Sequence, residues 1–571
     1  MLSPMTAPHD LIPGLAPHVA TELESHLEAS VLVGGATLFE AGDEPDGMAV
    51  IRRGRLAVLN DDGDVMEVFG SGEVIGEIGA LTGAQRTRTV VATRDTELLV
   101  MSQEVFEGLA TAHPTLVREL SRLVVDRLTS PDADDAGTRV PSTVALVTAD
   151  ESIDTTPLVD AFARIADGVS IMRAADVKGK TNAQRLSQLD ARERDNGLTV
   201  LDVGQVDDDP AWTEWCTRQA DEVLVVVSAT AANAPRALRD YAVALEDARC
   251  PLELVVVNPA SSSFPVDATA LRRALRADRV HHIKTADVLS ADRLARLLLG
   301  EGVGLTLSGG GAKGLAHIGA WRAISELGVD VDAVSGVSFG ALMAAGIALD
   351  YTADELHEMV TSRLIEQRSI FDPTLPVVAL LRGAGVSDEL KDVGEGRTFD
   401  QVWRPFLCSS CDLVSGSLVD HTEGPLWRAV RSSLSIPGVF PPVRSGDQLL
   451  VDGAVRDNLP VQSLRNAHPT PLKVIAVDVG GEGGLDAGRA PVDGTVSGWG
   501  QLRGRLLRRR RSDVPHLGQI MMRVVELAGS DAAGDADIVI KPDLSGLGIA
   551  DLGEMKRFEQ AGYEAAVQAL S

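Results

Sequence analysis

The chain has 571 residues, a length that indicates about three or four domains rather than one core. Hydrophobic residues make up 44% and charged residues 24% of the chain, which is ordinary for a globular protein. The net charge of −29 argues against a nucleic-acid-binding protein, because phosphate contacts need a surplus of Lys and Arg. No signal peptide is recognisable, and no stretch approaches the about 20 apolar residues that a membrane span needs. We therefore expect a cytoplasmic protein, with any membrane contact peripheral and at the inner face.

The first segment, residues 1–130, contains short alternating strands separated by Gly- and Asp-rich turns. Strands are expected over 48–51, 56–59 and 65–69, and apolar residues at helical spacing predict a helix over 116–128. This pattern predicts a compact all-β unit followed by helix. An acidic stretch with Pro and Gly then predicts a linker over residues 131–140.

The middle segment, residues 141–300, alternates apolar strands with helices, which predicts a doubly wound α/β domain. It has no G-x-x-x-x-G-K-[ST] loop, so we expect it to pack the other domains together rather than to act on nucleotides. The four cysteines are expected to be buried and reduced. Cys408 and Cys411 have no second ligand pair nearby, which argues against zinc, and we predict no metal.

The last segment, residues 301–571, begins with a strand that runs into Ser308–Gly314 and then a helix. Gly309, Gly310 and Gly311 leave backbone N–H groups uncovered at the positive end of the helix, which forms an anion cradle. The anion is either a reaction oxyanion or a dinucleotide pyrophosphate, since Gly309, Gly311 and Gly314 also match G-x-G-x-x-G.

The next strand leads into Gly336-Val-Ser-Phe-Gly340, a G-x-S-x-G motif in the strand–turn–helix context that the motif requires. The turn exposes the Ser338 hydroxyl at the carboxyl edge of the sheet. A nucleophile beside an oxyanion cradle is what acyl transfer needs, whereas a dinucleotide site needs no exposed serine. We therefore predict Ser338 as the nucleophile of an ester hydrolase.

The base that activates Ser338 is predicted to be Asp452, which ends a short apolar strand. Its unperturbed pKa of about 3.9 is low for a base, and burial would raise it. His468 follows Asp452 in the order of a conventional triad and is the alternative base. His317, on the helix after the cradle, is interpreted as a packing or capping residue.

These motifs together resemble the patatin-like phospholipases, over about residues 301–565. The matching stretches are Gly309–Gly314, Gly336–Gly340, Ser432–Pro442 and Asp452–Ala454. The resemblance implies a Ser338–Asp452 dyad without histidine, with Gly309, Gly310 and Gly311 as the oxyanion hole and no cofactor. Lys313 stands where the family more often has arginine, and Ala454 where Asp-Gly-Gly is common.

More narrowly, the stretches 375–383 and 212–221 resemble bacterial members of the neuropathy target esterase family, in which cyclic-nucleotide-binding-like domains precede a patatin domain. The resemblance implies lysophospholipid and phospholipid substrates. In the first segment, residues 76–89 are similar to a phosphate-binding cassette, with Glu77 for a ribose hydroxyl and Arg86 and Thr87 for a cyclic phosphate. Cyclic AMP or cyclic GMP is then a regulator, although Gln85 replaces the family's usual proline. The alternative is a cyclic-nucleotide sensor whose hydrolase domain is silent.

Two further stretches bear on access to the site. The apolar, proline-interrupted run 370–381 is interpreted as the wall of an acyl pocket, a lid, or core. The basic run 502–511 is interpreted as a contact with anionic lipid or as a solvated loop.

Overall fold

The computed structural model describes the chain except residues 1–14, 16, 62, 64, 71, 130–139, 150–152, 231–234, 248–249, 367–371, 469, 481–534 and 549–550. The chain divides into two compact units. The first comprises residues 1–260, 270–300 and 469–471, and the second comprises residues 261–269, 301–468 and 472–571. The predicted linker and the basic run 502–511 lie outside the described residues, except for residue 140.

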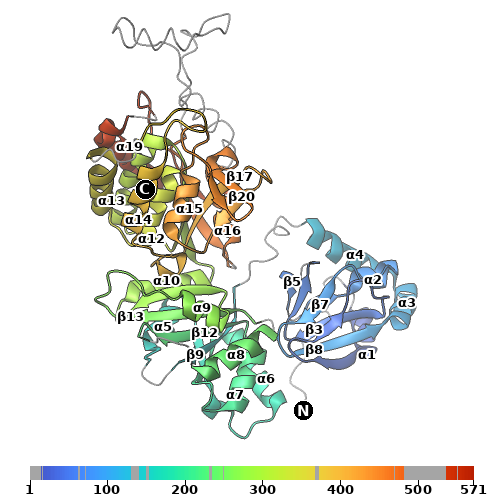
Figure 1. Ribbon diagram of the computed structural model, residues 1–571. Helices are drawn as coiled ribbons and strands as arrows, with labels where there is room; N and C mark the ends of the chain where they lie inside the picture. Colours follow the sequence, from blue (N-terminus) through green and yellow to red (C-terminus); the bar gives the residue numbers. More distant parts are fainter. Residues whose placement is uncertain are drawn as a thin grey trace, which may run out of the picture. The chain divides into compact units, whose positions relative to one another are not determined.

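The first unit begins with a β-roll, drawn in blue in Figure 1, in which two antiparallel four-stranded sheets are followed by helices. One sheet has the order β1-β8-β3-β6 and the other β2-β7-β4-β5. The strands are β1 (Glu28–Leu32), β2 (Thr37–Phe39), β3 (Gly47–Arg53), β4 (Leu56–Leu59), β5 (Val65–Phe69), β6 (Val74–Ile75), β7 (Thr89–Ala92) and β8 (Thr96–Ser102). The helices are α1 (Pro17–Ser25), α2 (Glu77–Thr82), α3 (Gln103–Ala112) and α4 (Pro114–Thr129). Leu116 and Leu120 of α4 are fully buried, as the helical spacing predicts.

The same unit continues with a parallel six-stranded sheet in the order β10-β11-β9-β12-β13-β14. Its strands are β9 (Thr143–Thr148), β10 (Val169–Arg173), β11 (Leu198–Gly204), β12 (Glu222–Ser228), β13 (Leu252–Asn258) and β14 (Arg279–Lys284). The helices are α5 (Thr156–Ile165), α6 (Asn182–Asp195), α7 (Pro210–Gln219), α8 (Arg236–Asp247), α9 (Thr269–Leu275) and α10 (Val288–Leu298). The apolar runs predicted as buried parallel strands are therefore confirmed.

The second unit is built on a mixed eight-stranded sheet in the order β19-β20-β17-β16-β15-β21-β22, with β18 also paired to β17. The strands are β15 (Gly302–Leu307), β16 (Ala333–Val337), β17 (Phe406–Asp412), β18 (Leu418–His421), β19 (Val443–Ser445), β20 (Gln448–Asp452), β21 (Leu472–Val477) and β22 (Ile538–Ile540). Strands β22, β21, β15, β16 and β17 are parallel, whereas β18, β20 and β19 are antiparallel to their neighbours.

Helices pack around this sheet (Figure 1). They are α11 (Ala316–Glu326), α12 (Phe339–Ala348), α13 (Ala353–Met359), α14 (Ala384–Gly394), α15 (Leu426–Ser433), α16 (Val461–Asn466) and α19 (Met555–Leu570), with a π-helix, η5 (Val360–Glu366). Helix α12 is buried along its whole length, which explains why it has no polar face. Within the described residues, no helix is long and apolar enough to cross a membrane. All four cysteines are buried free thiols.

Candidate active site

Ser338 stands at a strained turn between β16 and α12. Its backbone has φ 56° and ψ −126°, a conformation that a residue with a side chain rarely adopts. The flanking glycines permit the turn. A methyl group on Gly336 would lie 2.5 Å from the Gly340 carbonyl oxygen, and one on Gly340 would lie 2.2 Å from the Leu307 carbonyl oxygen. Both positions therefore require glycine if Ser338 is to be held at the carboxyl end of β16 in this conformation.

The pairing of β17 explains how Asp452 reaches Ser338. Strand β18 pairs with residues 408–411 along one edge of β17, so the ends of β16 and β20 must share the opposite edge. Val337 lies opposite Ser409, and Asp452 lies opposite Ser410, the next residue of β17. The two strands therefore run toward each other, and the side chains of Ser338 and Asp452 meet in a hydrogen bond.

Burial determines the acidity of Asp452, whose side chain is almost completely inaccessible. Removal from water raises the pKa of this carboxyl to about 7, although the hydrogen bonds from Ser338 and from the Ala454 backbone N–H (3.0 Å) favour the ionised form. A carboxylate with this pKa is suited to accept a proton near neutral pH.

The two histidines considered as bases are placed elsewhere. Burial lowers the pKa of His317 to about 4, and its Nε2 lies 2.9 Å from the Ser308 carbonyl oxygen, so it is a neutral packing residue. His468 follows α16 and precedes the amino end of β21. Because β21 is parallel to β15, and β15 to β16, His468 lies at the sheet edge opposite Ser338, on the order of 15–20 Å away along the strands. The alternative base is therefore wrong.

The glycine cradle lies directly against the nucleophile. A methyl group on Gly309 would be 3.0 Å from Ser338 Cβ. However, the Gly309 N–H donates to the Asn458 carbonyl oxygen at 3.3 Å, so it is engaged within the protein. Gly311, with φ 57°, begins a 3-10 turn over Gly311–Leu315 and borders the same cavity as Ser338. Of the three predicted donors, Gly310 and Gly311 are therefore better placed than Gly309 to bind an oxyanion.

An apolar cavity of about 140 Å³ opens at Ser338. Apart from the backbone of the cradle and the nucleophile, its lining is almost entirely aliphatic and aromatic, with an ion pair between Arg363 and Glu389. The lining residues are Gly311, Ser338, Phe339, Leu342, Met359, Arg363, Val386, Glu389, Leu390, Val393, Leu434, Ile436 and Phe440. Such a cavity accommodates a hydrocarbon segment beside the nucleophile.

Two supporting residues were not identified from the sequence. Ser433 Oγ accepts the Ser338 backbone N–H at 2.9 Å and donates to the Ser409 carbonyl oxygen at 2.7 Å, so it ties the nucleophile to β17. Asn458 holds the cradle through both its backbone and its side chain, whose Nδ2 donates to the Gly309 carbonyl oxygen at 3.4 Å. Ser433 lies in a stretch that the family resemblance marked, but nothing in that stretch indicated its hydrogen bonds.

In the β-roll, the predicted cassette residues are only partly gathered. Glu77, at the start of α2, and Arg86 are buried, whereas Thr87 is exposed. The Arg86 guanidinium donates to Asp46 Oδ1 at 2.7 Å and to two backbone carbonyl oxygens, and lies 4.1 Å above the Phe39 ring. Arg86, which was predicted to bind a cyclic phosphate, thus already has hydrogen-bond acceptors within the protein.

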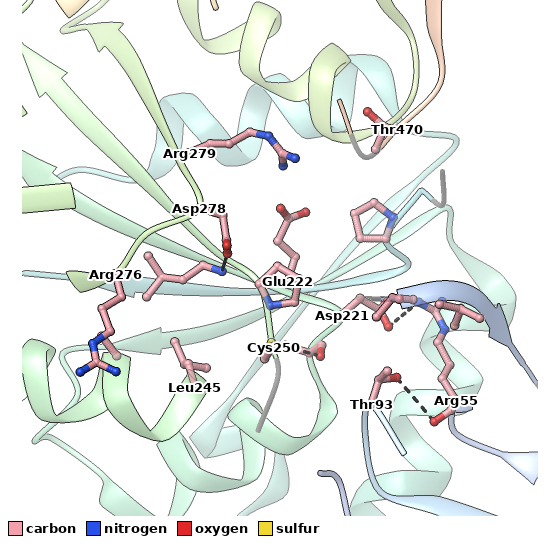
Figure 2. Close-up of a pocket in the computed structure, with 17 residues that line it drawn as sticks. Arg55, Thr93, Asp221, Glu222, Leu245, Cys250, Arg276, Asp278, Arg279 and Thr470 are labelled. Atoms are coloured by element: carbon pink, nitrogen blue, oxygen red, sulfur yellow. Dashed lines mark hydrogen bonds and ion pairs between the residues drawn. The ribbon is translucent and has the colours of Figure 1, made fainter. Parts of the chain in front are cut away.

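A second pocket, of about 480 Å³, lies within the first unit (Figure 2). Arg55 forms an ion pair with Asp221, and Arg279 forms one with Glu253 at 2.9 Å. Glu222 also borders the pocket, and burial together with the neighbouring Glu253 raises its pKa well above the ordinary value. Arg55, Asp221 and Arg279 thus have partners within the protein, and we assign no ligand to the pocket.

Comparison with known families defines the class of the protein. The patatin-like phospholipase family matches residues 305–465, and the cyclic nucleotide-binding domain family matches residues 31–113. Solved structures that resemble the chain include the Thermus thermophilus catabolite activator protein, which is 27% identical, covers 22% of this chain and 60% of its own, and has a TM-score of 0.20. The two family matches show that the chain is a lipid ester hydrolase of the patatin-like phospholipase class with an N-terminal cyclic nucleotide-binding domain, and the predicted fold class is confirmed.

Relatives that match most of the chain identify the family within this class. An uncharacterized NTE family protein of Mycobacterium tuberculosis is 30% identical over 551 residues, which cover 93% of this chain and 90% of the relative. The neuropathy target esterase sws of Drosophila melanogaster is 28% identical over 82% of this chain and 37% of its own. Lysophospholipase NTE1 of Coccidioides immitis is 26% identical over 96% of this chain and 40% of its own. The chain belongs to the NTE family, as its motifs predicted.

Proposed function

We propose that the chain hydrolyses the carboxylic ester bond of lysophospholipids and phospholipids, with Ser338 as nucleophile and Asp452 as general base. The observation that carries the proposal is the hydrogen bond between the Ser338 hydroxyl and a buried carboxyl whose pKa is raised to about 7. The Coccidioides relative that is named a lysophospholipase supports this substrate class.

The chemistry follows from the positions of these groups. Ser338 Oγ attacks the ester carbonyl carbon while Asp452 takes the hydroxyl proton, and the amides of Gly310 and Gly311 stabilise the oxyanion. Asp452 then protonates the departing alcohol, which leaves an acyl group on Ser338. Water, deprotonated by the same carboxylate, then attacks the acyl carbonyl carbon; the bond to Ser338 Oγ breaks, the fatty acid leaves, and Asp452 returns the proton to Ser338 Oγ. The apolar cavity would hold the acyl chain throughout.

The test is the Ser338→Ala variant, assayed on a water-soluble chromogenic ester and on lysophosphatidylcholine. We expect turnover to fall to background on both substrates, with an unchanged unfolding midpoint. Ser325→Ala is the matched control, because that hydroxyl donates to a carbonyl of its own helix, Trp321. If Ser338→Ala retained the activity of the wild type, the assignment would be rejected.

We further propose that cyclic AMP or cyclic GMP regulates this activity through the cyclic nucleotide-binding domain. The match of residues 31–113 to the cyclic nucleotide-binding domain family supports this proposal. Calorimetry should then show binding that Arg86→Ala removes, together with a change in ester turnover. Binding without any ester turnover in the wild type would favour the alternative, a sensor with a silent hydrolase domain. No heat at millimolar nucleotide would exclude both.

The dinucleotide interpretation of the cradle is set aside, because Ser338 occupies the space beside Gly309. Location in the cytoplasm, peripheral contact with the inner membrane face and the absence of a cofactor stay predictions.

A further inference from the structure

A short loop of the second unit exposes three large aliphatic side chains. Leu375 is 82%, Val377 88% and Val378 70% exposed, in the segment between η5 and α14. The run was interpreted as pocket wall, lid or core, and the core interpretation is wrong for these three residues. A monomeric protein rarely presents adjacent large apolar side chains so fully to water without a binding role.

This apolar loop, residues Asp372–Gly383, is held in a defined conformation. The Asp372 carboxylate accepts the backbone N–H groups of Gly383, Ala384 and Gly385 at 2.8–3.2 Å, which closes the base of the loop. Pro373 and Leu381 form a β-bridge above that base. The exposed tip is therefore presented by a fixed hairpin.

The base of the apolar loop adjoins the wall of the Ser338 cavity. The backbone N–H groups of Leu380 and Leu381 donate to the carbonyl oxygens of Gly438 and Val439 at 2.9 and 3.0 Å. The same segment contributes Ile436 and Phe440 to the cavity lining. At its carboxyl end, the loop leads into α14, which contributes Val386, Glu389, Leu390 and Val393 to the same lining. The carboxyl-terminal half of the loop thus contacts one part of the cavity wall and continues into another.

We propose that the apolar loop inserts Leu375, Val377 and Val378 into a phospholipid surface and thereby brings the cavity to its substrate. The inference rests on the proposed function, since an enzyme that removes acyl chains from lipids must meet them at an aggregate surface. The exposed Arg382 at the base of the loop supplies a cation for lipid phosphates. Insertion of apolar side chains is an attraction that does not depend on charge, and it opposes the repulsion between an anionic surface and a chain with a net charge of −29.

The test uses the full chain with Leu375→Asp and Val377→Asp combined. The matched control combines Val288→Asp and Leu289→Asp, which change the same residue types at positions 54% and 58% exposed on α10 of the first unit. Binding is measured by sedimentation with vesicles of phosphatidylcholine and of an equimolar mixture with phosphatidylglycerol, in the Ser338→Ala background to prevent turnover. Turnover is measured with Ser338 intact, on a water-soluble ester and on vesicle lipid.

We expect the loop variant to bind vesicles at least about tenfold more weakly and to hydrolyse vesicle lipid correspondingly more slowly. Its turnover of the water-soluble ester should equal that of the wild type and of the control. Vesicle binding equal to that of the wild type would overturn the proposal, as would loss of soluble-ester turnover, which would make the loop part of the active site. The proposal would also be overturned if the wild type were a dimer, the loop variant a monomer, and vesicle binding the same in both, because the loop would then be a subunit interface. Absence of soluble-ester turnover in the wild type would instead reject the proposed function.

Discussion

The acidity of Asp452 gives the sharpest test of the site. Its pKa of about 7 lies well above the ordinary value of 3.8 because the carboxyl is buried. If Asp452 must be ionised to accept the Ser338 proton, kcat/KM should fall on the acid side with an apparent pKa near 7. At pH 5 the rate should be about one hundredth of the plateau, since ionisation is then suppressed about hundredfold. The assay is a pH profile with a water-soluble ester, whose own ionisation is constant.

The burial of Asp452 makes stability depend on pH in the opposite direction from activity: activity should rise with pH, whereas stability should fall. The rise in the pKa from 3.8 to about 7 corresponds to about 4 kcal/mol at most. The folded state favours the neutral carboxyl. Its stabilising contribution to the free energy of unfolding is therefore fully present below about pH 4 and is lost as the pH rises through 7. The Asp452→Asn variant cannot ionise. Relative to the wild type, its free energy of unfolding should therefore improve between pH 4 and pH 8, while its kcat is lower by about 10²–10⁴-fold.

Two results would refute this reasoning. An acid limb of kcat/KM near pH 4 would mean that the carboxyl is hydrated in solution. The wild type and Asp452→Asn could also differ in unfolding free energy by an amount that does not change with pH. That result would mean that burial does not raise the pKa of Asp452. Either measurement, by denaturant titration or by kinetics, is independent of the other.

Two other side chains give predictions of their own. Ser433→Ala removes the acceptor of the Ser338 backbone N–H. It should lower kcat by about tenfold or more with little change in KM, because an unsatisfied buried donor costs about 1–3 kcal/mol. Ser433→Thr keeps the hydroxyl and should restore part of the rate, and a Thr variant as slow as the Ala variant would contradict this role of Ser433. Arg94→Met breaks a buried ion pair with Glu193 within the first unit, which should cost about 3–5 kcal/mol of unfolding free energy by chemical denaturation. Arg88→Met, which breaks an exposed pair, should cost less than about 1 kcal/mol, and equal effects would contradict the importance of burial.

The sequence was sufficient where function is encoded within a few consecutive residues. The turn around Ser338 is local, because Gly336 and Gly340 are needed for contacts made within the same strand–turn–helix unit or with the preceding strand. The strand that ends at Asp452 was also recognisable from its apolar run. Periodicity likewise gave the β-roll and the parallel sheet of the first unit.

Other features depend on pairing between distant strands, which a sequence pattern does not specify. The direction of β21 removes His468 from the site, and the shared edge of β17 brings Asp452 into it. The hydrogen bond of Ser433 and the engagement of the Gly309 amide both arise from segments that become neighbours only in the folded sheet. The apolar run 370–381 was ambiguous because hydrophobic residues that face a core and those that face a lipid have the same composition.

The absence of histidine from the proposed dyad follows from the same burial that makes the site apolar. In water, a carboxylate is too weak a base for a serine hydroxyl, and an imidazole, with its pKa near 6.5, is the usual solution. Here burial shifts the pKa of Asp452 into that range, so one residue serves where a conventional site uses two. The ionised, buried Asp452 carboxylate lowers the free energy of unfolding above neutral pH. A site of this kind must therefore be kept dry, which is consistent with a cavity lined by hydrocarbon and approached from a lipid surface.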